Sequence, residues 1–164
     1  MFDQINGLPV HPLVVHSVVV LLPLAAIGTI AIAARPVWRG PYGVLVVLFA
    51  AVATALTLIA KESGQELAAR VGNPGDHGAL GNGLIWFAIP LLLLALALVY
   101  LDRRHAAVHA RDPEADDRTL VALNIVAVLA IIAALVATVQ VYRVGDSGAR
   151  VTWGHLASTP GGSS

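Results

Sequence analysis

The chain has 164 residues, of which 57% are hydrophobic and 12% are charged, and its formal net charge at pH 7 is zero. A soluble domain carries about a quarter charged residues, so this composition indicates a membrane protein rather than a soluble domain. The balanced charge gives no reason to expect nucleic-acid binding, and the absence of cysteine excludes disulfides, thiolate zinc sites and iron–sulfur clusters.

Four uncharged apolar stretches are each long enough to cross a bilayer, which takes about 20 helical residues. They are Pro12–Ala34, Tyr42–Ala60, Leu84–Leu101 and Leu120–Tyr142. The first exceeds the apolar core of a secretory signal, about 7–15 residues, and no Lys or Arg precedes it, so we expect a retained helix. The predicted fold class is all-α, an integral membrane four-helix bundle. Residues 1–157 form one domain and residues 158–164 a disordered tail.

The segments that flank these spans are polar or rich in turn-forming residues. Pro12 suits the first turn of a helix, which predicts an extended His11 just before it. Residues 61–83 are predicted as a long loop, in which KESGQELAARVG could form a short interfacial helix after Ser63-Gly64. Residues 102–119 contain His105 and His109 at i, i+4 spacing, and we expect a solvated extension of the third helix there.

Residue types along the spans favour close helix packing. Small side chains let membrane helices approach one another without a hydrophobic driving force. Alanines of this kind crowd the second and fourth spans: Ala50, Ala51, Ala53, Ala55, Ala127, Ala130, Ala133, Ala134 and Ala137. Aromatic residues fall near both ends of the spans, where amphipathic rings prefer to lie. They are Trp38, Tyr42 and Tyr100 at one interface and Trp86, Tyr142 and Trp153 at the other.

The basic residues predict an orientation. Lys and Arg concentrate on the cytoplasmic side of membrane proteins. The first and third connections carry Arg35, Arg39, Arg103, Arg104, Arg111 and Arg118. The other side carries Lys61, Arg70, Arg143 and Arg150. Six against four predicts a multi-pass cell-membrane protein with both termini and the second connection extracytoplasmic.

This topology sorts the six histidines onto two sides. His105 and His109 fall inside, whereas His11, His16, His77 and His155 fall outside with Glu62, Glu66, Asp76 and Asp146. His16 lies about one turn inside the first span, where an ionisable group is a candidate functional residue. A structural alternative is that His16 hydrogen-bonds a carbonyl or Gln140 and only holds helices together.

Imidazole binds haem iron and transition metals. A bis-histidine haem b would take ligands from two separate elements, for instance His16 with His77 or His155. A copper, zinc or iron ion would take three or four of His11, His16, His77 and His155, with Glu62 or Asp146 as further candidates. His11 and His16 would differ by about 140° in direction if both were helical. They share a site only if the chain breaks at Pro12.

The opening GLPVHPLVVHSVVVLLPLAA resembles the G-x-P-x-HP-x-x-VH start of an uncharacterised bacterial membrane family, the domain of unknown function 2231. Further matches follow in order: Ser63-Gly64, His77 with Leu80-Gly81, and a Gly-x-x-Gly at Gly145–Gly148. The resemblance spans residues 7 to about 155 and implies a four-helix membrane protein. Some members carry Rieske-type iron–sulfur domains, which implies a place near electron transfer. This chain has Ser17-Val18 where the family commonly has Phe-Pro.

Two functions therefore stay open at this stage. The first is a haem b- or transition-metal-binding protein of membrane electron transfer, which would not be an enzyme. The second is a non-catalytic accessory or scaffold subunit of a membrane complex, with no cofactor. The expected partners are the lipid bilayer and either a redox partner or other subunits, and homo-oligomerisation stays open. A hydrolase is disfavoured because Ser63 and Ser147 lack the setting of a nucleophile elbow.

Overall fold

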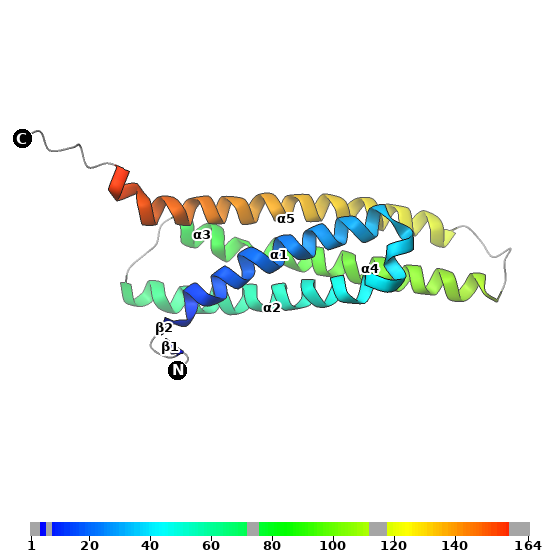
Figure 1. The fold of residues 1–164 in the computed structure, drawn as a ribbon, viewed down its shortest axis with the longest axis horizontal. Coiled ribbons are helices and arrows are strands. Elements are labelled where there is room, and N and C mark those ends of the chain that lie inside the picture. The colour runs from blue at the N-terminus through cyan, green and yellow to red at the C-terminus, as the bar shows by residue number, and fades with distance from the viewer. Residues whose placement is uncertain (1–3, 6–7, 72–75, 112–117, 158–164) are drawn as a thin grey trace, which may run out of the picture.

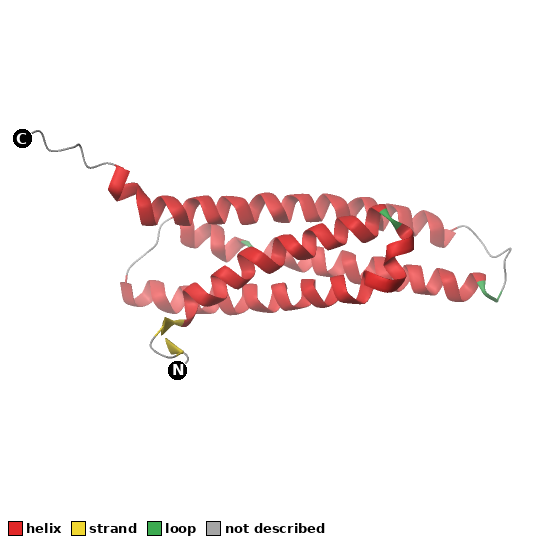
Figure 2. Ribbon diagram, viewed as in Figure 1, coloured by secondary structure: helices red, strands yellow, loops and turns green. Residues whose placement is uncertain are grey.

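Four long helices make up most of the molecule and run alternately in opposite directions (Figures 1 and 2). The computed structural model describes residues 4–5, 8–71, 76–111 and 118–157. The long helices are α1 (Val10–Ala34), α2 (Arg39–Val71), α4 (Ile85–His109) and α5 (Arg118–Ala157). The shorter elements are β1 (Gln4–Ile5), β2 (Leu8–Pro9), η1 (Pro36–Trp38) and α3 (Asp76–Gly83).

The four predicted membrane spans are confirmed. Each long helix contains a stretch long and apolar enough to cross a membrane: Leu13–Ala34, Pro36–Glu66, Gly78–His109 (with α3) and Arg118–Arg150. Helices form here because hydrocarbon offers no partner for backbone N–H and C=O groups, so each segment must bond them internally. The single domain over residues 1–157 stays a prediction, and the predicted tail, residues 158–164, lies outside the described part.

Two predictions about the span ends are wrong. His11 is not extended before the helix, because α1 already begins at Val10, directly after β2. The loop predicted over residues 61–83 is largely helical. The helix considered for KESGQELAARVG is present but is continuous with α2, which runs through Ser63-Gly64 to Val71, and α3 covers Asp76–Gly83. Backbone hydrogen bonding along α2 outweighs the preference of a single Ser-Gly pair for a turn.

The tight corner between α1 and α2 follows from Pro36. A proline disfavours helical geometry at the preceding residue, and Arg35 is extended, with φ −123° and ψ 91°. Helix α1 therefore ends at Ala34, and one turn of 3-10 helix leads into α2.

Each helix packs against two neighbours, in the cyclic order α1, α2, α4, α5, so α1 and α4 lie diagonally opposite. The core includes many small residues, as the alanine pattern predicts. Six of the nine alanines are buried, whereas Ala51 and Ala133 are half-buried and Ala55 is exposed; the buried ones are Ala50, Ala53, Ala127, Ala130, Ala134 and Ala137. Glycine tightens the bundle at two crossings: a Cβ on Gly28 would come within 2.9 Å of Val46 Cγ2, and one on Gly43 within 2.8 Å of Val99 Cγ2.

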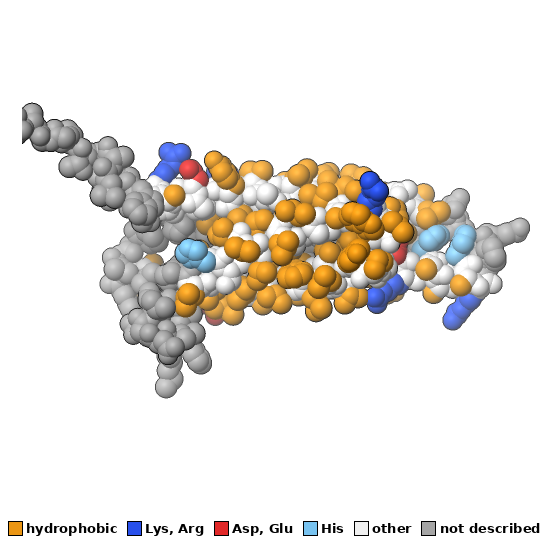
Figure 3. Space-filling model, viewed as in Figure 1, with side chains coloured by type: hydrophobic (Ala, Val, Ile, Leu, Met, Phe, Trp, Pro, Cys, Tyr) orange, Lys and Arg blue, Asp and Glu red, His pale blue; other side chains and the backbone are white. Residues whose placement is uncertain are grey.

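Hydrophobic side chains cover the middle of the visible face, and the charged and histidine side chains lie toward its two ends (Figure 3). On α4 the exposed rings of Trp86 and Tyr100 are separated by about 21 Å along the axis. Helix α5 is about 60 Å long, twice the roughly 30 Å of the hydrocarbon layer. Helix α5 therefore extends beyond the hydrocarbon layer.

Candidate functional site

The predicted histidine cluster belongs to the end of the bundle where α1 begins and α5 ends (Figure 1). His11 and His16 lie in α1, His77 in α3, and His155 in the last turn of α5. Consecutive antiparallel helices bring these elements to one end, although they are far apart in sequence. Below, this end is called the terminal end. The described part of the chain includes the side chain of His16; those of His11, His77 and His155 lie outside it.

Helix rise gives the distance of three of the histidines from buried residues of their own helices. At 1.5 Å per residue, His11 and His16 lie about 10 and 3 Å from buried Val18 along α1. His155 lies about 21 Å from buried Val141 along α5. The histidine positions are thus spread along the terminal end rather than gathered at one level.

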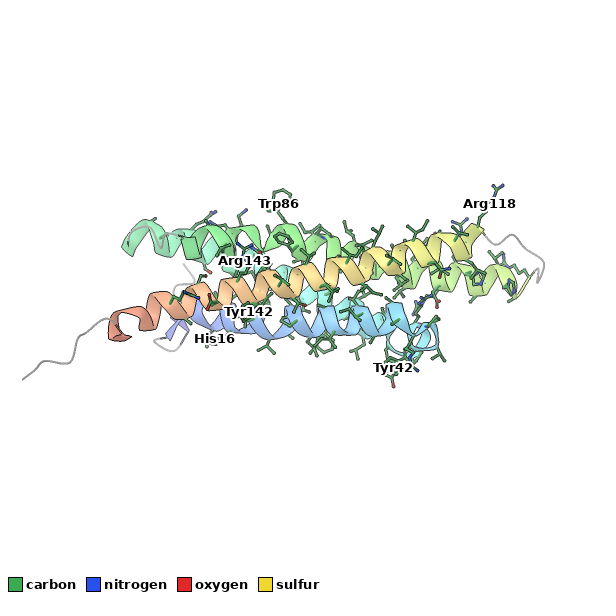
Figure 4. The ribbon with its side chains drawn as sticks, turned by 90° about the horizontal axis from the view of Figure 1, so that it is seen from above. His16, Tyr42, Trp86, Arg118, Tyr142 and Arg143 are labelled. Carbon is green, nitrogen blue, oxygen red and sulfur yellow. The ribbon has the colours of Figure 1, made fainter. Side chains whose placement is uncertain are left out.

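His16 occupies the outer surface of α1. Its side chain is exposed, and Figure 4 shows it at the edge of the bundle. Gln140, the alternative hydrogen-bonding partner, is 8% exposed and belongs to the buried face of α5. Because α1 is helical from Val10, His11 and His16 lie on faces about 140° apart. A single small ion is a poor fit for this pair.

The candidate carboxylates have separate surroundings. Glu62 and Glu66 are exposed on the extension of α2. Asp146 accepts a hydrogen bond from Arg150 Nε at 2.9 Å, one turn along α5. Among the described residues, no three or more His, Asp or Glu side chains come close enough to hold a metal ion.

The opposite end of the bundle holds the other two histidines, as predicted. Helix α4 continues past Tyr100 to His109, which confirms the helical extension over His105 and His109. Their ring centroids are 5.2 Å apart. Tyr42 and Arg118 mark this end in Figure 4, and Trp86, Tyr142 and Arg143 lie toward the terminal end.

A buried arginine at this opposite end was missed by sequence reasoning. Arg39, at the start of α2, is only 6% exposed, and its guanidinium contacts two other helices through three acceptors. Nε donates to Ile32 O at 3.0 Å and Nη2 to Ala33 O at 3.2 Å. Nη1 donates to Asp102 Oδ1 at 3.3 Å. These contacts join the end of α1, the start of α2 and α4.

The last carbonyls of a helix lack partners within the helix, and the planar guanidinium can satisfy two of them while pairing with a carboxylate. Pro36, which ends α1 close by, is the one local signal that could have pointed to Arg39. Its pairing with Asp102 could not be found in the sequence, because 63 positions separate the two residues.

Comparison with known proteins supports the architecture. The chain matches the model of the family described as predicted membrane protein (DUF2231) over residues 7–160. Searches of the curated proteins and of the solved structures gave no match. The match covers nearly the whole chain, including all four apolar helices. The chain therefore belongs to this family of predicted membrane proteins.

Proposed function

We propose that this membrane protein binds haem b or a transition-metal ion at its terminal end and takes part in membrane electron transfer rather than catalysing a reaction of its own. The observation that supports the proposal is that the backbone positions of His11, His16, His77 and His155 all belong to one end of the bundle, on α1, α3 and α5. In a chain without cysteine, imidazole is the side chain best suited to hold haem iron or a borderline transition metal.

Within the four, His11 and His77 are the preferred ligands. They lie on two separate elements, α1 and α3, and bundles hold cofactors between side chains of facing helices. His155 is the next candidate, from the end of α5. His16 contributes less, because its side chain is exposed on the outer face of α1. Glu62 and Asp146 are secondary candidates for a metal ion.

The proposed orientation puts the terminal end outside the cytoplasm. Arg35, Arg39, Arg103, Arg104, Arg111 and Arg118 all belong to the opposite half of the molecule. These six residues outnumber the four basic residues of the terminal end, which favours a cytoplasmic location for the half opposite the terminal end.

The second candidate is an accessory subunit without cofactor. The observation in its favour is the extension of α2 beyond Ala60, on which Glu62 and Glu66 are exposed. The extensions of α2 and α5 would then offer a rigid polar surface to another subunit, or to a second copy of this chain.

The two candidates differ in the colour and metal content of the protein. Protein without a histidine tag is purified in mild detergent, and its visible spectra are recorded oxidised and reduced, with metal analysis. The proposal predicts a Soret band or a stoichiometric metal that is lost in His11→Ala and His77→Ala. The matched control Gln65→Ala, an exposed polar residue at the same end, should retain it. A colourless, metal-free protein that copurifies with other subunits would refute cofactor binding and favour the accessory subunit.

A further inference from the structure

His105 and His109 form a pair of facing imidazoles that the proposed function does not use. They lie on one face of the last turns of α4, and their ring centroids are 5.2 Å apart with an interplanar angle of 34°. His105 is half-buried and His109 is exposed, so one ring is held against the bundle while the other has access to water.

This geometry suits chelation. A transition metal bonds imidazole nitrogen at about 2.0–2.1 Å. One ion can therefore bind both rings only if it lies between them and the two ligating nitrogens are a few ångströms apart. Residues at i, i+4 on a helix face the same direction and satisfy this condition without a change in the backbone. The remaining coordination positions would be filled by water.

The electrostatic setting also favours a cation. The pair lies at the C-terminal end of α4, where the helix dipole places a partial negative charge. Arg103 and Arg104 are exposed and project about 200° and 100° around the helix from His105, so water and salt screen their repulsion. Asp102, one turn earlier, is paired with Arg39 at 3.3 Å, so the carboxylate offsets the positive charge of that arginine and is not needed as a ligand.

The pair lies outside the hydrocarbon. Tyr100 marks the interface on α4, and His105 and His109 follow about 8 and 14 Å further along the helix. A hydrated ion can therefore reach the two rings directly from the aqueous phase.

We propose that His105 and His109 form a two-histidine binding site for a divalent transition-metal ion, at the end of the bundle opposite the terminal end. Copper is the most suitable probe, because divalent copper binds nitrogen ligands most tightly among the first-row ions. The site is separate from the proposed cofactor site and does not depend on it.

The test is a Cu²⁺ titration of the full-length, untagged protein in detergent, followed by calorimetry and electron paramagnetic resonance. The titration is also run in a His11→Ala, His77→Ala background, which removes the preferred ligands of the terminal end. Both proteins should bind an ion with two nitrogen donors. His105→Ala and His109→Ala should each lower the affinity at least about tenfold, since each leaves one ligand and removes the chelate advantage. Circular dichroism verifies that the helices are retained.

A register variant supplies the matched control. His105→Ala combined with Ala107→His keeps two imidazoles in α4, but about 200° apart around the helix. Ala107 is exposed, so the change does not disturb the core. The proposal predicts that this variant loses the tight site as His105→Ala does. Native affinity in the register variant, or a native spectrum without two nitrogen donors, would overturn the proposal.

Discussion

Replacing Arg39 by Ala should destabilise the bundle more than any exposed substitution near it. The guanidinium is 6% exposed and makes three hydrogen bonds, at 3.0, 3.2 and 3.3 Å. Its removal leaves the carbonyls of Ile32 and Ala33 and the carboxylate of Asp102 without their partner. Breaking a buried ion pair in this way costs about 3–5 kcal/mol. Asp102 is 27% exposed, so water relieves part of the cost, and we expect about 3 kcal/mol.

Two comparisons separate geometry from charge. Arg39→Lys keeps the positive charge but not the planar fork, so it cannot reach all three acceptors and should lose about 1–2 kcal/mol. Arg35→Ala is the matched control. Arg35 is exposed, and its contact is the Trp38 ring, with Cζ 5.8 Å from the ring centroid, so the loss should stay below about 1 kcal/mol.

The assay unfolds the protein in mixed micelles with an increasing fraction of a denaturing detergent. Circular dichroism measures the loss of helix, and the midpoint gives the stability of each variant. The three variants should rank Arg39→Ala, Arg39→Lys, Arg35→Ala in decreasing loss. If Arg39→Ala unfolds at the same point as Arg35→Ala, the contacts of Arg39 do not stabilise the junction of α1, α2 and α4, and the reasoning fails.

Two further predictions concern packing and orientation. Gly43→Ala should lower the free energy of unfolding by about 1–3 kcal/mol, because the added Cβ would come within 2.8 Å of Val99 Cγ2 in the buried α2–α4 contact. Gly40→Ala should be tolerated, because its Cβ meets no atom within 4 Å. The same unfolding assay measures both, and equal stability of the two variants would contradict the close approach. Reporters fused after Ala157 should be active outside the cytoplasm, and reporters inserted within residues 112–117 should be active in it; the reverse pattern would invert the proposed orientation.

The sequence by itself determined the four spans. Each span is specified locally, by an uncharged run long enough to cross hydrocarbon, and a membrane leaves such a run no alternative to a helix. It also determined that His105 and His109 lie opposite the other four histidines, because an even number of spans returns the chain to the same end. The alanine pattern indicated close packing for the same local reason.

Tertiary structure alone decided how these elements meet. Arg39 counted in the sequence only as one positive charge; its burial and its pairing with Asp102 depend on contacts across 63 positions. The relative levels of His11 and His77 depend on how α1 and α3 align along the bundle axis, which no local pattern encodes. The continuation of α2 through Ser63-Gly64 shows the same limit: neighbouring turns and packed helices, not the two residues themselves, decided the conformation there.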